Sequence, residues 1–165
     1  MQHQRTYTRQ KASAAFQTLE IREEDELFPI GIFEFNISRL EELIASNPDK
    51  FPIEITAIAP FARVNDSSLD QNHIPNADLS RPIILAEIAP GRFSLIDGNH
   101  RVAKATRAGI ATLPAFRVWF PDHVAFLTSQ EAYFTYIEYW NEKVDNLHGI
   151  TRRRRRQAGK SKPRA

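Results

Sequence analysis

Two closely spaced apolar runs separated by a Pro-Gly pair constrain the fold of this 165-residue chain more than any other feature. The first run, residues 82–88, is almost continuously apolar, which predicts a strand. Pro90-Gly91 then supplies a turn, and residues 92–96 are rich in residues that favour strands. We therefore predict a β-hairpin over residues 82–96.

A helix and a further strand follow this hairpin. Gly98 precedes a helical pattern from about residue 99 to residue 108, and Gly109 stands where helices commonly end on a glycine. Residues 113–119 predict another strand, with Pro114 near its start, where a proline is tolerated. This order of elements predicts an α/β (α+β) fold in which helices flank a mixed sheet.

The preceding part of the chain contains weaker patterns. Residues 30–37 are rich in strand formers and predict one strand. Ser38 and Glu41 have the spacing of a capping box, so a helix is predicted over residues 39–45. Residues 52–59 alternate in polarity and predict a short strand.

A long C-terminal helix is predicted after a second capping box, formed by Thr128 and Glu131. Its apolar positions recur at helical spacing, which indicates packing against a core rather than an exposed platform for bases. These positions are Tyr133, Tyr136, Ile137, Trp140 and Val144.

The charge of the chain is divided unevenly between its body and its C-terminus. Residues 151–165 contain eight basic residues and no acidic ones, so residues 1–150 carry 14 basic and 20 acidic residues, a net charge of about −6. We predict a mobile N-terminus over residues 1–12, one domain over residues 13–150 and a disordered basic tail over residues 151–165. The tail is also a candidate nucleic-acid-binding segment. Its arginines are Arg152, Arg153, Arg154, Arg155 and Arg156.

The composition narrows the possible chemistry. The chain has no cysteine, which excludes disulfides, thiolate metal sites and a cysteine nucleophile. The polar N-terminus and the lack of a long apolar run argue against a signal peptide and a membrane span, so a cytoplasmic location without membrane contact is expected. Three histidines have no partner at metal-ligand spacing and are expected on the surface or in loops. They are His73, His123 and His148.

The junction between the predicted hairpin and helix carries the chemistry. A helix N-terminus exposes unpaired N–H groups and attracts anions, and Gly98 would let the backbone approach a ligand. Arg101, in the first helical turn, could hold a phosphate or carboxylate. Asn99 lies between Gly98 and His100 and belongs to the same candidate phosphate-binding segment. His100 could donate to the same anion or move a proton, and Asp97 could bind Mg²⁺ or act as a base. A purely structural role, with Asp97 as a helix cap and Arg101 in a surface ion pair, stays an alternative.

These residues carry a resemblance to a known family. The segments Arg81 to Ile84, Gly91 to Leu95 and Ile96 to Arg101, followed by Ala105 and Gly109, resemble the core of the ParB/sulfiredoxin superfamily. The resemblance covers about residues 80–119, roughly a quarter of the chain. It implies a ParB/sulfiredoxin-like fold in a small stand-alone bacterial member, with phosphates of ATP or CTP bound by Gly98 through Arg101. Members include chromosome-partition CTPases, sulfiredoxins, free-serine kinases and ParB-like nucleases.

Departures from the family pattern exclude some of these activities. Sulfiredoxins need a cysteine where this chain has Asn99, and partition clamps carry a different loop and a DNA-reading domain for which residues 120–150 leave no room. The Asp-Gly-X-His-Arg form resembles the serine-kinase branch, which also needs a glutamate base. Glu23, Glu34 and Glu54 are all candidates for that base.

The sequence therefore predicts a nucleotide-phosphate-binding domain that acts through Asp97 to Arg101. If the protein is an enzyme, Asp97 and His100 are the expected catalytic residues, and the reaction is phosphoryl transfer or nucleotide hydrolysis with Mg²⁺ on Asp97. The alternative is a non-enzymatic module that associates with nucleic acid or protein through its arginine-rich tail.

Overall fold

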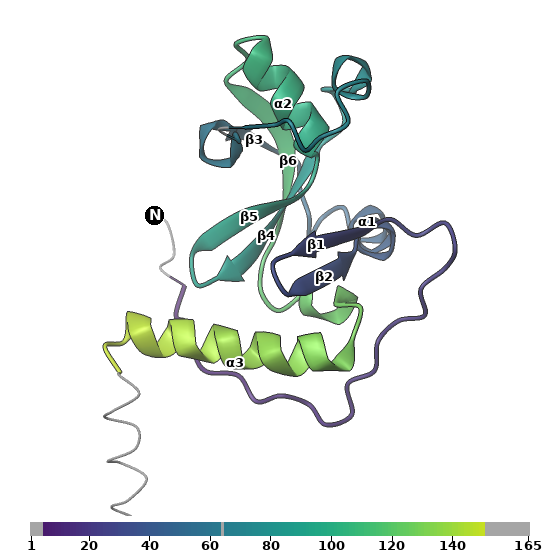
Figure 1. Ribbon diagram of the computed structural model, residues 1–165. Helices are drawn as coiled ribbons and strands as arrows, with labels where there is room; N and C mark the ends of the chain where they lie inside the picture. Colours follow the sequence, from purple (N-terminus) through teal and green to yellow (C-terminus); the bar gives the residue numbers. More distant parts are fainter. Residues whose placement is uncertain (1–4, 64, 151–165) are drawn as a thin grey trace, which may run out of the picture.

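The fold combines three helices with two β-sheets, as the computed structural model shows for residues 5–63 and 65–150 (Figure 1). The helices are α1 (Ile37–Ser46), α2 (Asn99–Arg107) and α3 (Gln130–Leu147). The strands are β1 (Leu27–Ile30), β2 (Phe33–Asn36), β3 (Glu54–Ala57), β4 (Ile83–Ala89), β5 (Arg92–Asp97) and β6 (Thr112–Val118). Three short 3-10 turns cover Ala59–Phe61, Ile74–Asn76 and Val124–Phe126.

The larger sheet has four strands in the order β3-β6-β4-β5. The central strand β4 pairs antiparallel with β5 and parallel with β6, and β3 pairs antiparallel with β6. All seven residues of β4 are buried, which is typical of a continuously apolar strand. The mixed sheet, its hairpin and the α+β class are thus confirmed, and the C-terminal helix has 18 residues.

The predicted strand over residues 30–37 is wrong in one respect. Gly31, with φ +58°, turns the chain there, so that β1 and β2 form a separate two-stranded hairpin. The residues favour strands, as expected. Pairing β1 with β2 gives their backbone N–H and C=O groups hydrogen-bond partners, which one unpaired strand would lack.

The helix starts also differ from the predicted capping boxes. Asn36, not Ser38, caps α1 by accepting a hydrogen bond from the backbone N–H of Arg39. The Ser38 hydroxyl instead accepts from the N–H of Glu26. At α3 the cap is Ser129, one residue after the predicted position. Neighbouring polar side chains compete for the same role, so sequence spacing alone leaves the start uncertain by one or two residues.

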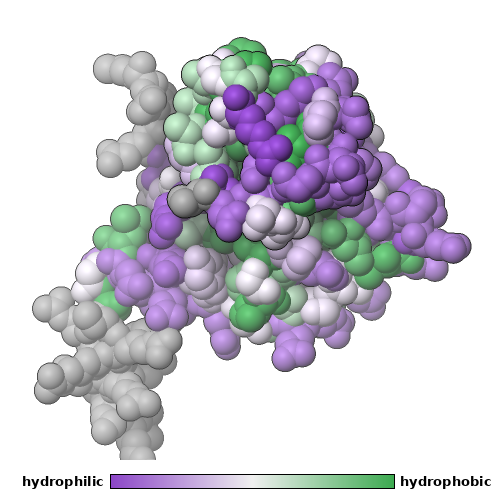
Figure 2. Space-filling view, turned by 45° about the horizontal axis from the view of Figure 1, so that its top comes forward, coloured by the Kyte–Doolittle hydropathy of each residue, from purple (hydrophilic) through white to green (hydrophobic). Residues whose placement is uncertain are grey.

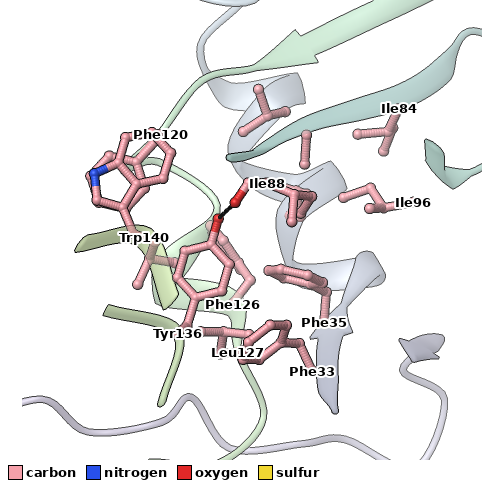
Figure 3. Packing of buried hydrophobic residues seen from close by; sticks show 14 of the residues in the cluster. Phe33, Phe35, Ile84, Ile88, Ile96, Phe120, Phe126, Leu127, Tyr136 and Trp140 are labelled. Carbon is pink, nitrogen blue, oxygen red and sulfur yellow. Dashed lines mark hydrogen bonds between the residues drawn. The ribbon is translucent and has the colours of Figure 1, made fainter. Parts of the chain in front are cut away.

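The larger core lies between the sheet and α3, and Figure 3 shows its packing. The predicted aromatic stripe of α3 is buried there, and the rings of Phe120 and Trp140 stack with their centroids 3.8 Å apart. The Tyr136 hydroxyl donates to the carbonyl of Ile88 at 2.8 Å. His123 lies in the turn before Val124–Phe126, which fits the expected loop position, but it is fully buried in the same region rather than on the surface. Nε2 of His123 forms a hydrogen bond with the backbone carbonyl of Glu87 on β4, and no sequence pattern predicted this contact.

The segment before β1 runs along α3 (Figure 1). Gln10 exchanges two backbone hydrogen bonds with the side chain of Asn141, and Phe16 stacks on Tyr133 at 3.8 Å. The Tyr7 hydroxyl donates to the carboxylate of Glu87. Residues 7–16 are therefore attached to the domain, while the proposed division at residue 12 stays a prediction. Among the helices of residues 5–150, none is long and apolar enough to cross a membrane.

Candidate functional site

The junction of β5 and α2 is built around Gly98. Its φ of +106° lies in the left-handed region that favours glycine. A Cβ atom at this position would lie 2.5 Å from Cγ2 of Ile83 on β4. The glycine is thus needed for close packing of the junction against β4, in addition to any approach to a ligand.

Asp97 and Arg101 form a buried ion pair across the first turn of α2. The Arg101 guanidinium donates from Nη2 to Asp97 Oδ2 at 2.6 Å, and both residues are less than 10% exposed. Its Nη1 donates to the carbonyls of Arg81 and Pro82, which precede β4. The guanidinium therefore joins the start of α2 to the start of β4, and Asp97 balances its charge.

The first turn of α2 leaves donors available. Gly98 is the residue before the helix, and within the described chain no side chain caps the N–H groups of this turn. Nε2 of His100 is also buried, with no hydrogen-bond partner among the described residues. A buried polar atom without a partner is costly, which makes this nitrogen a marker for a missing ligand or water. The His100 ring lies 5.9 Å from that of exposed His73.

A pocket of about 350 Å³ opens at this turn. All five residues from Asp97 to Arg101 line it, so the structure brings together every site residue predicted in this segment. Across from them, the lining includes Glu26, Arg63, Asp78 and Arg81. Figure 2 shows hydrophilic side chains over much of the end of the molecule that carries α2.

Glu26 is the acidic residue that the sequence did not single out. It precedes β1 and lines the pocket, and partial burial raises the pKa of its carboxyl, helped by the negative charges of Asp97 and Glu41. The positive charges of Arg81 and Arg101 lower the pKa of Glu26 and partly offset this rise. A raised pKa brings a carboxylate closer to the range in which it accepts protons efficiently.

The three candidate bases named from the sequence do not line this pocket. Glu34 accepts a hydrogen bond from the Thr128 hydroxyl, and Glu54 is ion-paired with Arg117 on the neighbouring strand. Glu23 is exposed in the turn before β1. Glu26 belongs to the same acidic run as Glu23, but only the folded chain shows which of its residues faces the pocket.

Two further predictions concern metal and nucleic acid. In the described ranges no group of three or more histidine or acidic side chains is arranged to hold a metal ion. Because Arg101 donates to Oδ2 of Asp97, Oδ1 is the oxygen left for a cation. Mg²⁺ commonly takes one or two carboxylates and completes its shell with phosphates and water, so Asp97 fits such an ion only together with a phosphate ligand. Arg152 to Arg156 lie outside the described residues.

A larger cavity lies elsewhere, between the β1–β2 turn and α3, and has a volume of about 760 Å³. It shares no lining residue with the pocket at α2.

Comparisons with known proteins gave no matching family model, no matching curated protein and no matching solved structure.

Proposed function

We propose that the pocket at the start of α2 binds the phosphates of a nucleotide. The observation that carries this proposal is the buried Nε2 of His100, which lacks a hydrogen-bond partner among residues 5–63 and 65–150, beside a helix N-terminus that no side chain in these ranges caps. Backbone N–H groups and an imidazole N–H can all donate to one phosphate, and the helix dipole favours its negative charge. The volume of about 350 Å³ is in the range of small-molecule sites.

The charges in the pocket suit a phosphate that brings a metal ion. Arg63 and Arg81 reach the pocket from exposed positions, so their guanidinium groups can pair with phosphate oxygens. Asp97 and Glu26 would repel a bare triphosphate, and Mg²⁺ between Asp97 and the phosphates would remove that repulsion. ATP and CTP are the candidate nucleotides, as the resemblance to the ParB/sulfiredoxin superfamily implies. We propose that the protein binds them in the cytoplasm.

Phosphoryl transfer is the reaction that this arrangement supports best. In this step the Glu26 carboxylate takes the proton of an acceptor hydroxyl or water. The freed oxygen bonds to the γ-phosphorus, and the bond to the β-phosphate oxygen breaks. His100 and the N–H groups of α2 would hold the transferred group, while Arg101 keeps Asp97 and the helix in position.

Calorimetric titration of the full chain with ATP, CTP and GTP, each with Mg²⁺, tests the proposal. We expect one nucleotide to bind, and His100→Ala to weaken that binding about tenfold or more, because a hydrogen bond to a charged group is lost. His73→Ala is the matched control, since it removes a neighbouring exposed imidazole that does not line the pocket. Equal effects of the two substitutions, or no binding at millimolar nucleotide, would contradict the proposal.

A second candidate function is association with nucleic acid through the basic tail. The observation in its favour is the uneven charge of the chain. Residues 151–165 hold eight basic and no acidic residues, whereas residues 1–150 carry a net negative charge. It predicts salt-sensitive binding of single-stranded DNA that depends on Arg152 to Arg156 and not on His100.

A further inference from the structure

A cavity larger than the pocket at α2 forms an open groove along α3, called here the α3 groove. Its volume is about 760 Å³, and residues of the β1–β2 turn and of the C-terminal half of α3 line it. Ile32, in the turn, forms part of its wall and is 75% exposed. Phe33, Ile88 and Tyr139 add apolar surface. An apolar groove of this size on a domain surface suits a chain segment that packs into it.

One wall of the α3 groove is acidic. Glu138, Glu142 and Asp145 are spaced four and three residues apart on α3, so they lie along one face of the helix. Glu138 and Glu142 are exposed, whereas Asp145 is buried and receives the guanidinium of Arg9 at 2.6 Å. The groove therefore combines apolar contact surface with exposed negative charge.

The described chain ends by turning into this groove. Gly149, with φ +69°, donates to the carbonyl of Asn146, and Ile150 donates to the carbonyl of Asp145 at 2.8 Å. This pair of bonds is a Schellman motif, which reverses the chain at a helix end. Ile150 itself lines the α3 groove, so the described part of the chain ends beside the acidic wall.

We propose that the arginine-rich segment 151–156 of the same chain docks along the α3 groove. Six extended residues span at most about 22 Å. The seven residue steps from Asp145 back to Glu138 rise only about 10 Å along the helix, so the segment is long enough to reach both exposed glutamates. The charges are complementary, because the segment holds five consecutive arginines.

The chemistry of arginine fits both parts of the groove. Its aliphatic stem packs on apolar surface such as Ile32 and Tyr139, while its guanidinium stays at the edge and pairs with a carboxylate. Arginines held in this way are less available to other polyanions. Docking therefore lowers the affinity of the tail for nucleic acid, and the two contacts compete for the same side chains. This inference is independent of the pocket at α2.

Limited trypsin digestion of the full-length protein tests the docking, with cleavage after residues 152–156 followed by mass spectrometry. We expect Glu138→Gln/Glu142→Gln to speed this cleavage about two- to tenfold, which corresponds to the loss of exposed ion pairs. The control is Glu23→Gln/Glu24→Gln, which removes the same charge from an exposed turn outside the groove. It should leave the rate unchanged. Raising the salt concentration should speed cleavage of the unsubstituted protein and not of Glu138→Gln/Glu142→Gln.

Equal cleavage rates for the unsubstituted protein and Glu138→Gln/Glu142→Gln would overturn the docking. An equally large increase in the control variant Glu23→Gln/Glu24→Gln would also overturn it.

A fluorescent 20-nucleotide single-stranded DNA tests separately whether docking and nucleic-acid binding compete for the tail. Its affinity should rise about two- to tenfold in Glu138→Gln/Glu142→Gln and stay constant in the control. Unchanged affinity in both would overturn the competition.

Discussion

Arg101 lies one helical turn after Asp97 and donates to its Oδ2 at 2.6 Å, with both side chains almost removed from solvent. A cation at a helix N-terminus is electrostatically unfavourable by itself. Here Asp97 and the carbonyls of Arg81 and Pro82 compensate it, so Arg101 is part of the framework of the site. The residues that offer free donors to a ligand are its neighbours in the same turn.

We expect Arg101→Ala to lower the free energy of unfolding by about 3–5 kcal/mol, because it leaves the Asp97 carboxylate buried without its partner. Urea denaturation at pH 7 measures this. Arg81→Ala is the comparison, since its ion pair with Glu41 is exposed and contributes less than about 1 kcal/mol. Similar losses in the two variants would show that Arg101 is not a framework residue.

Gly98→Ala should also destabilise the fold, through two separate costs. The left-handed backbone costs about 1–2 kcal/mol for a residue with a Cβ atom. The contact of that atom with Ile83 adds about 1–3 kcal/mol of overpacking. Gly109 also has a left-handed backbone, with φ +70°, and no atom lies within 4 Å of a Cβ added there, so Gly109→Ala should show the first cost alone. Equal urea midpoints for the two variants would contradict the packing of the junction.

Stability should fall in mild acid because of His123. Burial lowers the pKa of His123 to about 4, below its ordinary value of 6.5. Between these pH values the unfolded chain binds a proton that the folded chain does not, so the free energy of unfolding decreases as pH falls from about 6.5 to 4. The full effect is about 3 kcal/mol. His123→Gln should remove this part of the pH dependence, which urea denaturation at several pH values measures; an unchanged slope would refute it.

Glu26→Gln tests the assignment of a base. If a nucleotide is hydrolysed or transferred, we expect turnover to fall about 10²–10⁴-fold while nucleotide affinity stays within a few fold, since the amide cannot accept the proton. Glu23→Gln, in the same acidic run but outside the pocket, is the control. Loss of turnover in Glu23→Gln alone would move the base to that residue.

The sequence was most informative where one short segment determines the structure. The apolar run of β4, the turn at Gly91 and the glycine before α2 predicted the hairpin and the junction, because each depends on neighbouring residues. Glu26 could not be found in this way, since it reaches the pocket only after the β1–β2 hairpin packs beside the sheet. The same holds for His123, whose burial depends on a carbonyl of β4.

The central claim is that a nucleotide binds at the start of α2, and an NMR titration of the full chain tests it most directly. On addition of Mg²⁺ with ATP or CTP, we expect the backbone amide signals of Asn99, His100 and Arg101 to shift most, because the phosphates accept hydrogen bonds there. Signals from the α3 groove should change little. No shift at millimolar nucleotide, or the largest shifts at residues 138–146, would contradict the claim.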